Sequence, residues 1–197
     1  MILTGEEFKA LIEKDPSWCK DLKKPLEITT FLNLKNSNIT HLSPLITFKG
    51  NDDGRSANFE NCKKIKIATG TFRGLVNFAD STIEKIEKLK VTGTNSDGVS
   101  ATFYGCQNLK VAIGNYEGFV NFAYSGVTTI KDLVVKNICR YGKKAAFTGC
   151  PIAYAPKEYR KKEFEFEKKV VKSSEIKDKT TREIINKIKS EANNIEL

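Results

Sequence analysis

Residues 76–91 read VNFADSTIEKIEKLKV, and residues 120–135 read VNFAYSGVTTIKDLVV, an offset of 44 residues. A weaker version, LNLKNSNITHLSPLIT, occupies residues 32–47, another 44 residues earlier. When residues 58–89 are aligned with residues 102–133, 13 of the 32 positions are identical. A repeat this regular indicates that one structural unit has been duplicated along the chain.

Large apolar residues recur at a shorter spacing inside each unit. The intervals between successive anchors are 25, 19, 25, 19 and 25 residues, which predicts coils of about 22 residues that alternate between long and short. Because no coil can bury its own anchor, the coils must stack into a solenoid in which each stabilises its neighbours. The anchors are Leu34, Phe59, Phe78, Phe103, Phe122 and Phe147.

The residues around each anchor alternate as in a β-strand. Val76 and Phe78 are expected to point into the core, while Asn77 between them points outward. Ser81, and cysteine at the equivalent position of other coils, is expected inside the turn that follows. The apolar residues beyond that turn would close the remaining walls of the core, and they are Ile83, Ile86 and Leu89.

Glycines recur at the same 44-residue offset. Gly54, Gly98 and Gly142 end the loops NDDG, NSDG and CRYG, where a positive φ is useful, and these loops account for the longer coils. A second set is expected to mark the shorter turn in IATGTFRG and VAIGNYEG, and it consists of Gly70, Gly74, Gly114 and Gly118.

The segment from Phe103 to Leu109, Phe-Tyr-Gly-Cys-Gln-Asn-Leu, resembles the BspA-type leucine-rich repeats of bacteria. The resemblance covers roughly residues 27–155 and implies an α/β solenoid, a leucine-rich-repeat-like stack of about six coils. Each coil would contribute one short strand to a parallel sheet, with helical N-terminal and C-terminal caps. Serine replaces asparagine in one phrase, and phenylalanine or alanine replaces leucine in others, so a regular horseshoe curvature does not follow.

Two other solenoids fit parts of the pattern. The phrases ANFEN, VNFAD and ATFYG are similar to pentapeptide repeats, but that family places its phrase on every face, whereas here it occurs once per coil. A parallel β-helix of the polysaccharide-lyase kind is the second alternative. It carries with it the alternative function of a carbohydrate-active enzyme, with Glu60 and Asp80 as its carboxylates.

Three regions are predicted along the chain: a helical cap over residues 1–26, the solenoid over 27–155 and a C-terminal cap over 156–197. Thr4 and Glu7 form a capping box that opens an amphipathic helix. At the other end, residues 163–167 alternate like a strand, and residues 178–193 are typical of a helix. The first helix would bury Phe8, Leu11 and Ile12, and Trp18 would complete that cap.

Composition excludes few partners. The chain has a net charge of +9, from 33 Lys and Arg against 24 Asp and Glu, but the excess is spread along its length. A basic nucleic-acid or anionic-surface protein acting through RKKEFEFEKKVVK is therefore the less favoured alternative. No membrane span and no export signal are visible, which predicts a cytoplasmic protein, with a translocated effector as the alternative.

The sequence contains no recognisable catalytic, cofactor or metal motif. Cys62, Cys106 and Cys150 recur two coils apart, about 10 Å, which is too far for a disulfide and predicts a buried column of free thiols. His41 has no nucleophile or carboxylate partner in a known motif and is predicted to lie at the surface. We therefore expect a non-enzymatic protein without cofactors.

The outward face of the strands suggests a function. A column of mostly asparagine residues is expected to form a hydrogen-bonded ladder between coils, and exposed aromatic residues lie beside it. This composition is typical of protein-binding surfaces, and BspA-type repeats commonly serve in interaction and host-contact proteins. We therefore predict a protein-binding module. The candidate face comprises Asn77, Asp80, Tyr104, Phe119, Asn121 and Tyr124.

Overall fold

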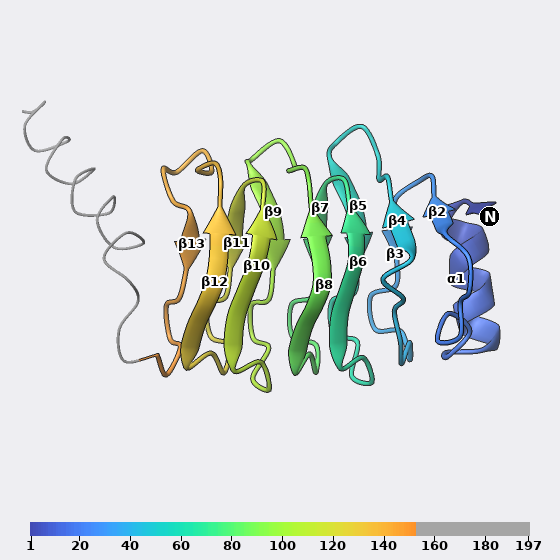
Figure 1. The fold of residues 1–197 in the computed structure, drawn as a ribbon, viewed down its shortest axis with the longest axis horizontal. Helices are drawn as coiled ribbons and strands as arrows, with labels where there is room; N and C mark the ends of the chain where they lie inside the picture. The colour runs from blue at the N-terminus through green and yellow to red at the C-terminus, as the bar shows by residue number, and fades with distance from the viewer. Residues whose placement is uncertain (153–197) are drawn as a thin grey trace, which may run out of the picture. The chain divides into compact units, whose positions relative to one another are not determined.

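The computed structural model describes residues 1–152, and these residues form a parallel β-solenoid in which the chain runs alternately through two sheets (Figure 1). Sheet A contains β1 (Ile2–Leu3), β2 (Leu26–Ile28), β4 (Ile46–Phe48), β6 (Ile67–Phe72), β8 (Lys85–Val91), β10 (Val111–Tyr116) and β12 (Thr129–Val135). Sheet B contains β3 (Leu32–Asn33), β5 (Arg55–Asn58), β7 (Leu75–Asn77), β9 (Val99–Thr102), β11 (Phe119–Asn121) and β13 (Ala145–Ala146).

Sheet B follows the predicted anchors closely. Its strands shift register near the start of β5 and β11, but at their ends Asn58, Asn77, Thr102 and Asn121 lie side by side. The anchor rings behind them stack face to face along the core, at centroid distances between 5.1 and 5.5 Å. Each ring is thus covered by the coil before it and the coil after it. The stacked rings are Phe59, Phe78, Phe103, Phe122 and Phe147.

Sheet A is paired in doublets. Strands β6 and β8 pair from Ile67 to Phe72, and β10 and β12 pair from Val111 to Tyr116. Between the doublets, β8 and β10 share only two residue pairs, and so do β4 and β6. The 44-residue repeat of the sequence therefore corresponds to one doublet of coils.

The core lies between the two sheets. Phe48 and Phe72 of sheet A stack at 4.5 Å, and their rings meet the phenylalanines of sheet B edge to face at 6.1 to 6.3 Å. Later coils replace these rings with Val91, Tyr116 and Val135, all buried. Such edge-to-face contacts are favoured by the charge distribution of aromatic rings, so the two stacks hold each other in place.

The predicted N-terminal helix and its capping box are confirmed. Helix α1 (Gly5–Lys14) begins with the Thr4/Glu7 capping box, in which the Thr4 hydroxyl accepts from the Glu7 N–H. Phe8 and Ile12 are buried, whereas Leu11 is only half-buried. Phe8 meets the ring of Phe48 at 6.2 Å and the indole of Trp18 at 5.9 Å, which closes the first coil.

The fold class was predicted only in part. A solenoid of stacked coils with parallel strands is confirmed, but the expectation of one sheet in α/β coils is not met. A second parallel sheet forms the opposite wall, and α1 is the only helix among residues 1–152. Gly70 and Gly114 were placed wrongly, because they lie inside β6 and β10 with φ of 107° and 124°. The predicted C-terminal strand and helix lie outside the described residues.

The turn from sheet B to sheet A is the same in every coil. The residue two positions after each anchor has a positive φ, between 55° and 71°. Its successor is a serine or cysteine that faces the core, and Cys62 and Cys106 donate from Sγ to carbonyls of the preceding coils. All five cysteines are free. The positive-φ column is Asn36, Asn61, Asp80, Gly105, Tyr124 and Gly149.

Candidate functional site

The six residues of the predicted binding surface divide between the strands of sheet B and the turns that follow them. Asn77 and Asn121 lie in register on the outer face of this sheet, and Phe119 lies two residues before Asn121 on the same strand. Tyr104, Asp80 and Tyr124 occupy the turns that continue these strands. Backbone bonds such as Asp80 N–H to the Tyr104 carbonyl, at 2.7 Å, keep the coils in register there.

The column of asparagines has a different role from the predicted one. Each side-chain oxygen accepts a hydrogen bond from the backbone N–H two residues later in its own coil, at 2.9 Å for Asn77 and for Asn121. Thr102 makes the equivalent bond at 3.3 Å. These bonds open the turn that follows each strand. The predicted ladder between coils is therefore wrong, and the one cross-coil bond of this column runs from Asn77 Nδ2 to Glu60, at 3.3 Å.

Tyr104 and Tyr124 come together on this face. Their rings contact each other edge to face with centroids 5.4 Å apart, and the side chains are 41% and 50% exposed. Tyr124 holds a φ of 56°, which is uncommon for an aromatic residue, and Gln107 Nε2 donates to its carbonyl. The ring lies against Gly149 of the next coil, because a Cβ at that glycine would stand 2.5 Å from Tyr124 Cδ1.

Asp80 occupies the equivalent turn one doublet earlier. Its carboxylate lies over Gly105, where a Cβ would stand 2.1 Å from Asp80 Oδ1. Lys63 Nζ donates to the Asp80 carbonyl at 2.5 Å. The exposed carboxylate therefore lies in the coil next to that of Tyr104, so an acidic group borders the tyrosine pair.

A shallow groove of about 290 Å³ adjoins Asn77 on the same face. It is lined by half-buried Phe31 and Leu75 and by Arg55, together with Glu60. The Glu60 carboxylate is bound by Lys35 at 2.8 Å and by Asn77, so its charge is compensated. Arg55 was missed by sequence reasoning. The signal was present, because Arg55 pairs with Leu75 in the outward column that also contains Phe119.

Groups suited to metal binding or acid–base chemistry are sparse on the described residues. No group of three or more His, Cys, Asp or Glu side chains in residues 1–152 could hold a metal ion. Burial raises the pKa of Cys19, Cys62 and Cys106 to about 11, which makes these thiols weak nucleophiles at neutral pH. His41 is exposed, as predicted, and bonds to Thr40.

The fold and this face define a class: a parallel β-solenoid with a helical N-terminal cap and a partly apolar, aromatic outer face. Comparison with protein-family models, with curated proteins and with solved structures finds no match to this chain. Within the part of the chain that the structure describes, no helix is both long and apolar enough to cross a membrane.

Proposed function

We propose that this solenoid is a non-enzymatic protein-binding module and that the outer face of sheet B is its interface. The observation that carries the proposal is the contact between Tyr104 and Tyr124, two half-exposed rings in the turns that follow neighbouring strands of sheet B. Tyrosine combines a large apolar ring with a hydroxyl, and it is enriched among the residues that contribute most to binding.

The surroundings of the pair support the same function. Phe119, Leu75 and Phe31 supply half-buried apolar surface along one outward column, while Asp80, Glu60 and Arg55 place charges beside them. An apolar patch bordered by polar and charged groups is the usual anatomy of a protein interface. Because the strands are held in one register, the partner meets a surface that is already ordered, which lowers the entropic cost of binding.

The test is a quantitative pull-down with the immobilised full chain from native lysate. Tyr104→Ala and Tyr124→Ala should lose the partners that the wild-type protein retains, because each removes half of the aromatic contact. Val134→Ala is the control, since Val134 is 49% exposed but lies on sheet A. Recovery of the same proteins by all four baits would contradict the proposal.

Salt dependence separates this proposal from polyanion binding. Binding through the tyrosine pair should change little between about 50 and 200 mM salt, whereas a protein that neutralises six or more phosphates loses about 10³-fold in affinity over that range. A steep loss of all partners, together with nucleic acid in the eluate, would favour the basic alternative.

A further inference from the structure

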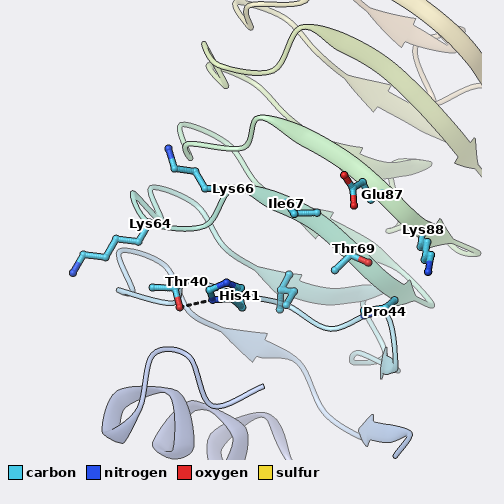
Figure 2. A pocket seen from close by; sticks show the side chains of 10 residues that line it. Thr40, His41, Pro44, Lys64, Lys66, Ile67, Thr69, Glu87 and Lys88 are labelled. Carbon is cyan, nitrogen blue, oxygen red and sulfur yellow. Dashed lines mark hydrogen bonds between the residues drawn. The ribbon is translucent and has the colours of Figure 1, made fainter. Parts of the chain in front are cut away.

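A trench of about 290 Å³ lies on the outer face of sheet A, above β6 (Figure 2). Ile67 and Thr69 of β6 form its floor. The segment before β4 forms one wall through His41 and Pro44, and the facing part of β8 forms the other (Figure 2). This trench contains none of the residues of the proposed protein interface.

The trench exists because β4 is short. Strand β4 has three residues and pairs with β6 only through Thr47 and Phe48, whereas β6 pairs with β8 over its whole length. Residues 40–45 make no strand pairing, and the Ile46 N–H closes a turn onto the Ser43 carbonyl at 3.2 Å. Pro44 lacks an N–H and could not complete a ladder there. The first half of β6 is therefore flanked by a strand on the β8 side only.

A β-bulge in β8 places two residues of opposite charge on the far wall. Ile86 pairs with Ala68 and Leu89 pairs with Gly70, so both Glu87 and Lys88 lie opposite the single residue Thr69. Consecutive residues of a regular strand point to opposite faces, but the bulge, with Lys88 at φ 51°, leaves both side chains exposed on one face. Neither forms an ion pair with another residue in 1–152.

The floor contains a hydroxyl that the fold does not use. Thr69 as a whole is only 4% exposed, and its side chain makes no hydrogen bond within residues 1–152. Because no buried side-chain oxygen of the described residues lacks a partner, the Thr69 hydroxyl opens to the solvent of the trench. In the other doublet the equivalent residue is Ile113, which shows that this strand position accepts an apolar side chain. The Thr69 hydroxyl is therefore available to a bound molecule.

The imidazole on the near wall is anchored through one of its two nitrogens. His41 Nδ1 hydrogen-bonds with the Thr40 hydroxyl at 2.8 Å, and this hydroxyl also bonds to the Pro16 carbonyl at 3.1 Å. His41 Nε2 makes no hydrogen bond within residues 1–152. The near wall thus offers a ring nitrogen to a ligand in the trench.

We propose that this trench binds a free α-amino acid with an apolar side chain. An α-amino acid has an ammonium and a carboxylate one carbon apart, and the trench is lined by one residue for each group, Glu87 for the ammonium and Lys88 for the carboxylate. Its side chain lies on Leu42, Pro44 and Ile67. The Thr69 hydroxyl and His41 Nε2 bond the remaining polar atoms. The volume equals that of about ten water molecules, which suits one amino acid rather than a long peptide.

The experiment titrates the full chain with L-leucine by calorimetry and compares three derivatives. Leucinamide lacks the carboxylate, N-acetyl-leucine lacks the ammonium, and N-acetyl-leucinamide lacks both. We expect saturable binding of L-leucine, and binding about fivefold weaker for each loss of one charged group. Absence of saturable leucine binding would overturn the proposal. Equal or tighter binding of any derivative would overturn it too, because the site would then recognise a peptide rather than a free amino acid.

Variants locate the site. Glu87→Gln and Thr69→Val should each weaken L-leucine binding about fivefold and leave the far-ultraviolet circular dichroism unchanged. The matched control is Lys131→Gln, because Lys131 occupies the position of Glu87 in the other doublet and does not line the trench. Binding that survives both trench variants, or that is lost in Lys131→Gln, would place the ligand elsewhere and overturn the assignment.

Discussion

Sheet B joins every neighbouring pair of coils through the same two positions, whereas sheet A pairs long strands only within a doublet. The difference begins at the ends of the strands. On sheet B each coil closes with the same turn, opened by Asn77 or its equivalent and completed by a residue of positive φ. Sheet B shifts register only near the start of β5 and β11, whereas each doublet of sheet A shifts register within its long paired strands, at Lys88 in one and at Asp132 in the other.

This comparison shows where the fold leaves side chains free for other purposes. The regular turns of sheet B engage their asparagines in backbone hydrogen bonds, so only the residues between them, such as Tyr104 and Phe119, remain for a partner. The bulge of sheet A turns an additional charged side chain outward in each doublet. Irregularity in the second sheet therefore gives Glu87 and Lys88 positions that regular strands could not provide.

The largest effect is expected at the phenylalanine stack of sheet B. Phe78 lies 5.1 Å from Phe59 and 5.5 Å from Phe103, and it meets Phe72 of sheet A edge to face. Phe78→Ala would remove contacts within and between the sheets, so the free energy of unfolding should fall by about 3–5 kcal/mol, measured by urea denaturation.

Tyr104→Ala is the control for that measurement, because Tyr104 is 41% exposed and belongs to the outer face. It should change the free energy of unfolding by less than about 1 kcal/mol. A loss below 1 kcal/mol for Phe78→Ala would contradict a continuous core shared by both sheets.

The sequence predicted sheet B better than sheet A for a physical reason. The anchors of sheet B are large, buried and followed by a fixed turn, so the spacing of Phe59, Phe78 and Phe103 reports their geometry directly. Sheet A has inward positions filled by Phe48, Phe72 and then Val91, and residues of such different size show no visible period. Its strands were therefore not recognised, and an α/β pattern was expected instead.

The two candidate sites also differ in how far the sequence could predict them. Asn77, Phe119 and Asn121 follow from alternation along short strands, whereas Asp80, Tyr104 and Tyr124 lie in the turns that follow the strands, and the role of these six residues stays a prediction. The trench could not be predicted, because it depends on the short strand β4 and on the bulge at Lys88. One signal was available, since Thr69 and Lys88 correspond to Ile113 and Asp132 in the repeat while Ala68 is kept as Ala112.

A smaller effect is expected at the turns of sheet B. Gly105 has a φ of 68°, and a Cβ there would meet Asp80 Oδ1 at 2.1 Å. Gly105→Ala combines an unfavourable φ with this clash and should lower the free energy of unfolding by about 2 kcal/mol.

Two comparisons separate the cost of the unfavourable φ from the cost of the clash with Asp80. Gly142→Ala has a φ of 75° but open space around it, so it should lose only about 1 kcal/mol. In an Asp80→Gly background, which removes the clashing carboxylate, Gly105→Ala should also lower the free energy of unfolding by only about 1 kcal/mol. An unchanged cost in that background would show that the packing between these two turns is not responsible.

The smallest effect at neutral pH is expected in the column where cysteine and serine alternate. Cys106 donates from Sγ to the Phe78 carbonyl at 3.1 Å, and Ser81 donates to the same carbonyl at 2.6 Å. Serine is therefore an adequate replacement, and Cys106→Ser should change the free energy of unfolding by less than about 1 kcal/mol at pH 7.

The same substitution should have a clear effect at alkaline pH. Burial raises the pKa of Cys106 to about 11 from an ordinary value of 9.0, so the thiolate is less favourable in the folded chain than in the unfolded one. The stability that depends on this thiol is complete below about pH 9 and is lost as the pH rises toward about 11. Urea midpoints measured at pH 8 and 10.5 should therefore fall less in Cys106→Ser than in the wild-type protein. Because the buried Tyr116, whose pKa is also raised by burial, is present in both proteins, an equal fall would show that the Cys106 thiol does not contribute to the alkaline loss.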